Sequence, residues 1–152
     1  MNYIRNSAKA IIIKDNRVLL TKNIDDAGFF YLFPGGGQEF GEELHETVVR
    51  ECMEEAGCEI DVGELVFARE YIGRNHEFAK WDTNLHQVEF YFRCSLLSED
   101  ETIRNGKIPD TNQVGVEWIP IINLCDIRLY PQELAAKIKR KISKPVYLGD
   151  VN

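Results

Sequence analysis

The sequence has 152 residues, of which 44% are hydrophobic, and this suits one globular domain spanning residues 1–152 with a full core. A net charge of −7 and a pI near 5.0 argue against broad electrostatic binding of bulk nucleic acid. The apolar run at residues 10–13 is too short for a signal-peptide core and no later run approaches a membrane span, so no membrane partner is expected. The four cysteines form no Cys-x-x-Cys pair and the three histidines lack zinc-like spacing, which favours reduced thiols and a cytoplasmic location.

The first predicted elements are strands. Two apolar runs, residues 8–13 and 18–21, flank a polar stretch at residues 14–17, and this pattern predicts a β-hairpin. A polar loop is expected over residues 23–28, followed by a short aromatic strand at residues 29–33. Pro34 ends that strand, so the strand delivers the glycine-rich stretch that follows it.

Three consecutive glycines, Gly35, Gly36 and Gly37, come directly after this proline. Glycine lets a backbone approach a phosphate or a metal closely and adopt positive φ angles. A glycine cluster before a helix is a weak signal by itself, so its meaning depends on what the helix carries.

A helix is predicted over residues 43–56 because apolar residues recur every four positions. This stripe consists of Leu44, Val48, Cys52 and Ala56, with Val49 and Met53 beside it. Glu42 and Glu43 are expected in the first turn, where negative charge meets the positive end of the helix, and Gly57 is expected to close the helix in a left-handed conformation.

The same helix carries three carboxylates on one side. At about 100° per residue, Glu51, Glu54 and Glu55 fall within one arc of roughly 100°. Glu51 and Glu55 repel each other across one turn, and a bridging Mg²⁺ or Mn²⁺ ion would relieve that repulsion. Arg50 is placed to orient or neutralise a carboxylate of this cluster. The alternative is an ordinary solvated charged face, which is the commoner meaning of a Glu-rich helix.

The glycines and the helix together resemble the Nudix hydrolase signature: Gly, five residues, Glu, seven residues, Arg-Glu, aliphatic, any residue, Glu-Glu, any residue, Gly, aliphatic. The residues in register are Gly36, Glu42, Arg50, Glu51, Glu54, Glu55 and Gly57. Cys52 and Cys58 stand at the two aliphatic places, where a buried thiol acts as a small hydrophobe. The match covers 23 of the 152 residues.

The rest of the chain predicts further strands and one helix. Residues 58–71 read as a bent or bulged strand interrupted at Gly63, and residues 87–94 as a half-buried strand at the sheet centre. After a long polar connection at residues 98–112, residues 114–119 form a strand whose Trp118 is expected in the core.

Pro131 opens a last helix with Leu134, Ile138 and Ile142 facing inward. Its basic residues, Lys137, Lys139, Arg140 and Lys141, could suggest a nucleic-acid patch, but cations near a helix C-terminus are ordinary.

This order of elements indicates an α/β layered fold, and the Nudix resemblance implies an α/β/α sandwich around a mixed β-sheet. It also implies Mg²⁺-dependent or Mn²⁺-dependent cleavage of a nucleoside diphosphate linked to another moiety X, giving a nucleoside monophosphate and phosphorylated X. Glu51, Glu54 and Glu55 would hold metal or activate water, Arg50 would orient Glu51, and the Gly35 carbonyl could be a further ligand. Gly36 and Glu42 would shape the loop, and Gly36 and Gly37 would contact the substrate.

Two alternatives to this enzyme are a Nudix-fold module that binds a nucleotide without cleaving it and a purely structural acidic helix. Loss of signature carboxylates would mark the silent module, and all of them are present here. The expected partner is a small nucleotide, and homodimer formation is left open.

Substrate specificity is expected in the connection at residues 73–84, where Arg74 and Trp81, together with His76 and Phe78, could stack on a base and contact phosphate. An equally weighted alternative is a surface loop whose aromatic residues fold back on the core.

A carboxylate from outside the helix is expected to complete the metal site, because Mg²⁺ favours six oxygen ligands. In many Nudix enzymes a distal Glu has this duty, but Gln113 stands where that Glu would be sought. The candidates are the acidic residues of the long connection, Glu99, Asp100, Glu101 and Asp110, of which Glu101 and Asp110 are favoured over a merely solvated loop.

Overall fold

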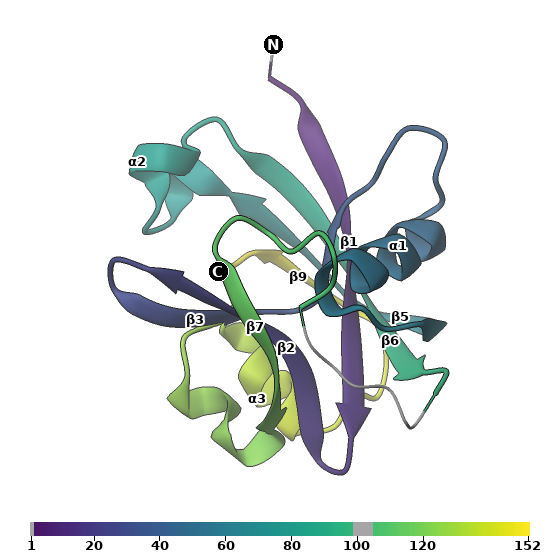
Figure 1. Cartoon of the computed structure of the whole chain (residues 1–152). Helices are drawn as coiled ribbons and strands as arrows, with labels where there is room; N and C mark the ends of the chain where they lie inside the picture. The colour runs from purple at the N-terminus through teal and green to yellow at the C-terminus, as the bar shows by residue number, and fades with distance from the viewer. Residues whose placement is uncertain (1, 99–104) are drawn as a thin grey trace.

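The computed structural model describes residues 2–98 and 105–152 and shows a mixed, curled β-sheet with helices against it (Figure 1). The strands are β1 (Ile4–Lys14), β2 (Arg17–Asp25), β3 (Gly28–Leu32), β4 (Gly35–Gly37), β5 (Ile60–Ile72), β6 (His86–Leu96), β7 (Gln113–Pro120), β8 (Leu129–Tyr130) and β9 (Val146–Asp150). The helices are α1 (Leu44–Ala56), α2 (Ala79–Asp82) and α3 (Glu133–Lys139), with 3₁₀ turns η1 (Gly73–Asn75) and η2 (Ile121–Asp126).

The sheet has two parts that meet where β1 turns into β2. One part runs β4-β1-β6-β5-β9, with β1 parallel to β6 and β5 parallel to β9. The other runs β7-β2-β3-β8, with β3 parallel to β8. The predicted α/β class and mixed sheet are therefore confirmed.

The predicted hairpin is present as β1 and β2, joined by Asp15 and Asn16 with φ angles of 50° and 57°. Positive φ at both positions matches the primed turns that suit the twist of paired strands. The loop predicted at residues 23–28 is wrong in extent, because β2 continues to Asp25 in antiparallel pairing with β3. Asn23 is buried there, and its amide donates to the Thr21 carbonyl oxygen at 3.2 Å.

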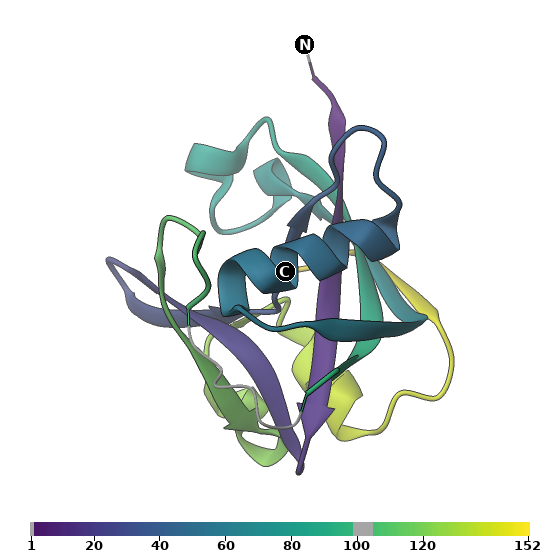
Figure 2. The same ribbon diagram turned by 45° about the vertical axis from the view of Figure 1, so that its right-hand side comes forward.

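Helix α1 lies across β1 and covers one side of the sheet (Figure 2). Val48, Cys52 and Ala56 are fully buried against β1, β5 and β6, and Gly57 closes the helix at φ 63°. Two details of the predicted helix are wrong. Glu43 is the residue that precedes the first turn, and Val49 and Met53 are 41% and 42% exposed, because they lie on the side that faces away from the sheet.

A second core cluster lies on the other side of the sheet and includes the predicted inward residues Leu134 and Ile138 of α3. Strand β6 runs between β1 and β5 as predicted, but it is buried on both faces. Phe92 lies in the α1 cluster, whereas Tyr91 and Glu89 are buried on the opposite face.

Trp118 packs on the α1 cluster, as predicted, and β5 carries the predicted irregularities near Gly63. The short elements α2, β8 and β9 were not predicted. In the part of the chain that the structure describes, no helix is long and apolar enough to cross a membrane.

Candidate active site

The glycine loop is pressed against β1 and α1 so closely that larger residues would collide. A Cβ atom on Gly35, which has φ 143°, would lie 2.1 Å from the Ala8 carbonyl oxygen. A Cβ atom on Gly36 would lie 2.5 Å from the carboxyl carbon of Glu51. The two glycines therefore allow the loop backbone to lie directly against a strand and a carboxylate.

Arg50 connects the glycine loop to the helix and also contacts two carboxylates of the cluster. It donates from Nε to Glu42 Oε1 at 2.6 Å and from Nη2 to the Gly37 carbonyl oxygen at 3.0 Å. Its Nη1 donates to Glu51 at 3.0 Å and to Glu54 at 3.4 Å. The hydrogen bond from Arg50 is the main reason why the pKa of Glu42 falls to about 2, so this loop carboxylate stays ionised.

The third glutamate of the cluster has a different setting. Glu55 is only 3% exposed, and its Oε2 accepts a hydrogen bond from the Gly35 backbone N–H at 3.0 Å. Burial raises the pKa of Glu55 to about 8, although the positive charge of Lys9 and the Gly35 N–H act in the opposite direction. Burial also raises the pKa of Glu51. A divalent cation that bound at Glu55 would therefore have to displace the proton that this buried carboxyl holds near neutral pH.

Asp110, one of the two favoured distal candidates, lies beside this cluster. Its side chain is within hydrogen-bonding reach of the Glu55 carboxyl and contributes to the raised pKa of that group. Glu99, Asp100 and Glu101 lie outside the described residues.

Gln113, which stands at the place of the expected Glu, has a structural role. Its Nε2 donates to the Glu55 backbone carbonyl at 2.8 Å and to Asn105 Oδ1 at 2.9 Å. A carboxylate could not donate these bonds.

The side chains fit a divalent cation by their chemistry. Glu51, Glu54, Glu55 and Asp110 supply oxygen donors around a loop that only glycine can bring so close. Glu51 and Glu54 nevertheless share Arg50 as a donor and Glu55 accepts from the Gly35 N–H, and among residues 2–98 and 105–152 no three His, Cys, Asp or Glu side chains are gathered as a metal group. The Gly35 carbonyl oxygen accepts a hydrogen bond from Lys9 Nζ at 3.1 Å.

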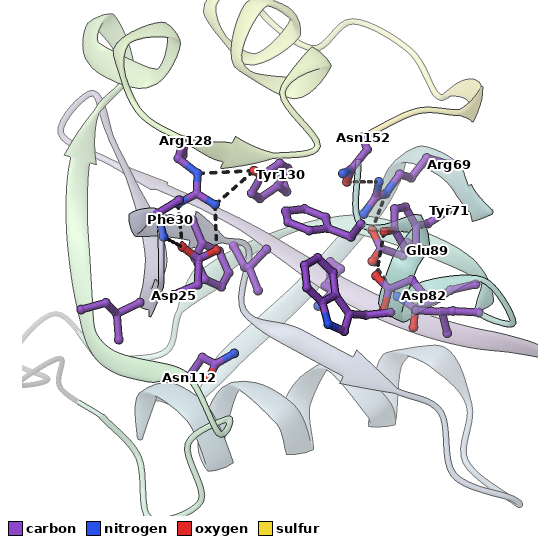
Figure 3. Close-up of a pocket in the computed structure, with 18 of the residues that line it drawn as sticks. Asp25, Phe30, Arg69, Tyr71, Asp82, Glu89, Asn112, Arg128, Tyr130 and Asn152 are labelled. Carbon is purple, nitrogen blue, oxygen red and sulfur yellow. Dashed lines mark hydrogen bonds and ion pairs between the residues drawn. The ribbon is translucent and has the colours of Figure 1, made fainter. Parts of the chain in front are cut away.

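A cleft of about 1010 Å³ adjoins this site at Lys9, which lines it. Figure 3 shows that its labelled charged residues form two groups on opposite walls. Residues from β2, β3, β5, β6, the connection at residues 73–85 and β8 contribute to the lining. The cleft is therefore built from segments that are far apart in the sequence.

The first wall centres on Arg128, which forms a two-pronged ion pair with Asp25 at 3.0 and 2.8 Å. Its guanidinium lies 5.4 Å from the ring centre of Phe30 and 5.8 Å from that of Tyr130. These distances are typical of cation–π contacts. The wall thus offers aromatic rings held in place by a fixed charge pair.

The second wall contains a buried ion pair. Arg69 donates from Nε to Glu89 at 2.6 Å, and the two side chains are each 6% exposed. Arg69 also donates to the Val151 carbonyl and to Asn152 Oδ1. Burial alone would raise the pKa of Glu89, but the charges of Arg69 and Lys9, together with hydrogen bonds from Arg69 and Tyr91, outweigh burial and lower the pKa to about 2.

A family model described as NUDIX domain matches residues 4–144. The chain belongs to the Nudix family. Membership of this family indicates that the protein is an enzyme, a pyrophosphohydrolase.

Solved structures support the same fold at low sequence identity. A Nudix hydrolase from Nitrosomonas europaea is 20% identical, with 97% of this chain and 78% of that chain covered and a TM-score of 0.69. An ADP-ribose pyrophosphatase from Streptococcus suis is 18% identical, with 96% and 98% covered and a TM-score of 0.61. A UDP-X diphosphatase is 17% identical, with 96% and 68% covered and a TM-score of 0.66.

The two residues predicted to read the substrate in this Nudix chain are placed differently. Trp81 lines the cleft and is 74% exposed, and Phe78 lines it with its ring 5.7 Å from Tyr130. Arg74 is exposed on η1 and is not among the described residues that line the cleft. The predicted connection thus reaches the Nudix cleft through its aromatic residues.

Three cationic residues of the site were not predicted, and two of them left a sequence signal. Lys9 interrupts the apolar run at residues 8–13, and Arg69 occupies the same alternating face as Phe67 and Tyr71. A charge at an inward position of a strand is unusual and marks a paired or functional residue. Arg128 lies in an irregular segment without periodicity and gave no such signal.

Proposed function

We propose that this Nudix hydrolase uses Mg²⁺ or Mn²⁺ to cleave the pyrophosphate linkage of a nucleoside diphosphate joined to another moiety X. The products are a nucleoside monophosphate and phosphorylated X. One observation carries the proposal: Lys9 lines the aromatic cleft and also donates to the Gly35 carbonyl of the carboxylate site. A nucleoside in the cleft would therefore place its phosphates at the Nudix signature, residues 36–58, which we call the box.

The residues around the box supply the remaining chemistry. Glu51, Glu54 and Glu55 are the proposed ligands, with the Gly35 carbonyl and Asp110 as further oxygen donors. A divalent ion bound there supplies charge neutralisation of the pyrophosphate and a lowered pKa for water. Arg50 holds Glu51 and Glu54 in orientation, and Lys9 presents a positive charge to the substrate phosphates.

The names of two structural neighbours agree with this substrate class. One is described as an ADP-ribose pyrophosphatase and the other as a UDP-X diphosphatase, and both names denote nucleoside diphosphate derivatives. For this chain the aromatic wall, Phe30, Phe78, Trp81 and Tyr130, supports recognition of a base by stacking. The homodimer left open by the sequence stays a prediction.

The competing function is a catalytically silent nucleotide-binding module. The presence of Glu51, Glu54 and Glu55 in the box favours hydrolysis over this alternative. We further propose that the chain acts as one domain in a reducing, cytoplasmic location, which its four cysteines support, since none of them forms a disulfide in the part of the chain that the structure describes.

The direct test is incubation of the purified protein with Mg²⁺ and a panel of nucleoside diphosphate derivatives, followed by identification of the phosphorus-containing products. We expect paired release of a nucleoside monophosphate and phosphorylated X from at least one member. Nucleotide binding without release of product from any member, at saturating Mg²⁺ and Mn²⁺, would support the silent module instead.

A further inference from the structure

Residues 73–85, which we call the aromatic arm, connect β5 to β6 and contain α2. Phe78, Trp81, Asp82 and Leu85 of this arm line the cleft. Figure 1 shows α2 at the periphery of the molecule, and Trp81 is 74% exposed. The arm therefore has little core packing of its own to hold its aromatic residues over the cleft.

The two ends of the arm meet at its base. The Gly73 N–H donates to the Leu85 carbonyl at 2.9 Å, and a Cβ atom on Gly73 would lie 2.0 Å from the Asp82 carbonyl oxygen. Tyr71 donates its hydroxyl hydrogen to Asp82 Oδ2 at 2.8 Å. The base of the arm is thus closed by direct contacts between its two ends.

One carboxylate outside the arm fastens this base to the sheet. Asp150, at the end of β9, accepts hydrogen bonds from the Ile72 N–H at 2.9 Å, from Asn75 Nδ2 at 2.8 Å and from His76 Nε2 at 2.5 Å. The His76 ring also stacks on Tyr71, with ring centres 5.3 Å apart and planes 13° from parallel. The carboxylate of Asp150 therefore accepts three hydrogen bonds from residues where β5 ends and the arm begins.

We infer that Asp150 is a positioning residue for substrate binding, because it fixes the aromatic arm over the cleft through Asn75, His76 and the Ile72 backbone. Asp150 does not line the cleft among the described residues, so its effect reaches the substrate only through the arm. Charge-assisted hydrogen bonds of this kind are the stronger ones in proteins. The inference rests on the proposed function, since it assigns the arm a nucleoside as its ligand.

A further link connects the same strand end to the second wall of the cleft, which contains Arg69. Directly after Asp150, the Val151 carbonyl and the Asn152 side chain accept hydrogen bonds from Arg69. Residues 150–152 therefore form hydrogen bonds both with the start of the arm and with Arg69 of the cleft wall.

The test compares Asp150→Ala and Asp150→Asn with wild type. We expect Asp150→Ala to raise KM about tenfold with kcat changed by less than about twofold, since the arm contributes binding and not chemistry. Asp150→Asn keeps one carbonyl oxygen that can accept from Ile72 and His76 but loses the bond to Asn75, so its KM should lie between the two.

Glu70→Ala is the matched control. Glu70 lies opposite Asp150 in the β5–β9 register and accepts hydrogen bonds from His86 and Tyr147. Among the described residues, its side chain has no hydrogen bond or ion pair with residues 73–85. We expect its KM to match wild type. Equal KM values for Asp150→Ala and Glu70→Ala would overturn the inference.

A second readout is independent of activity. Hydrogen exchange followed by mass spectrometry should show faster exchange at residues 73–85 in Asp150→Ala, with unchanged exchange in α1. Unchanged exchange of the arm in a folded Asp150→Ala variant would also overturn the inference. If wild type cleaves no substrate while arm exchange responds as expected, the proposed function fails and the positioning role of Asp150 stands.

Discussion

The carboxylate site and the cleft beside it are built in opposite ways. The partners of Arg50 in the carboxylate site all lie between Gly37 and Glu54. In the cleft, the Arg128–Asp25 pair joins residues 103 positions apart, and the hydrogen bond from Arg69 to Val151 joins residues 82 positions apart. The contacts of Arg50 at the proposed catalytic residues of this Nudix chain are therefore local, whereas the proposed substrate cleft depends on pairing between strands that are far apart in the sequence.

This difference predicts which property of the protein a substitution in each region should change. A substitution in the box alters a compact unit that helix periodicity and glycine packing hold together. A substitution in the cleft alters one wall of a space assembled from several strands. We therefore expect variants of the box to change turnover and variants of the cleft to change binding or stability.

The largest effect is expected from Glu54→Gln and Glu55→Gln, which remove a charged oxygen donor each. Activity with Mg²⁺ should fall by about a thousandfold or more, while the unfolding temperature stays near that of wild type. Steady-state assays at saturating metal and circular dichroism measure these quantities. Glu46→Gln on the same helix is the control, because an amide oxygen can still accept the Glu43 N–H in the cap. Full activity in either box variant would remove that residue from the proposed site.

The second effect concerns stability and separates the cleft from the box. The folded-state pKa of Glu89 is about 2, below its unfolded value, so its contribution is present above the unfolded pKa and is lost as pH falls through the folded one. The shift corresponds to roughly 3 kcal/mol, lost between about pH 5 and pH 2.

Glu89→Gln should therefore unfold in less urea than wild type at pH 7 and show a flatter decline in stability as pH falls. Glu64→Gln, which removes the exposed partner of Arg93, should behave like wild type. Parallel pH profiles for wild type and Glu89→Gln would contradict the assigned role of the buried pair.

A moderate effect is expected at the border between the two regions. Asp110 comes from the connection before β7 but lies against Glu55, so Asp110→Asn should lower turnover about tenfold at saturating Mg²⁺, or ~1.4 kcal/mol. Asp126→Asn, an acidic residue of η2 away from the box, is a comparison variant. A loss below about threefold, under ~0.7 kcal/mol, would remove Asp110 from the metal site.

The smallest effect is expected from the arm. Stacking on an aromatic residue contributes about 1 kcal/mol or more per base, so Trp81→Ala should raise KM about fivefold. Arg74→Ala should leave KM unchanged, because Arg74 does not line the cleft among the described residues. The two variants form a matched pair within one segment. A larger KM change in Arg74→Ala than in Trp81→Ala would reverse the assignment within the arm.

The box could be predicted because its residues are neighbours in the sequence and its helix has a clear period. The spacing of Val48, Cys52 and Ala56 predicts the buried face, and Gly57 predicts its end. The same pattern could not show that Val49 and Met53 stay exposed. The spacing of apolar residues does not reveal how wide a face of the helix the sheet covers.

The cleft could not be predicted because its pairs depend on strand register. Arg128 reaches Asp25 only because β8 pairs with β3, a contact of two residues that no sequence period marks. Asp150 meets His76 only because β9 runs parallel to β5. Short edge strands of this kind carry too few residues to show an alternating pattern.

The most direct test of the separation between catalytic residues in the box and binding residues in the cleft is calorimetry. It measures binding of a nucleoside monophosphate in the presence of a chelator. The probe is the nucleotide released from the preferred substrate, and the proteins are wild type, the double variant Glu54→Gln/Glu55→Gln, and Trp81→Ala. The account predicts that the box variant binds with a Kd within about twofold of wild type, while Trp81→Ala binds about fivefold more weakly. Loss of binding in the folded box variant, together with unchanged binding in Trp81→Ala, would contradict the separation of chemistry from specificity.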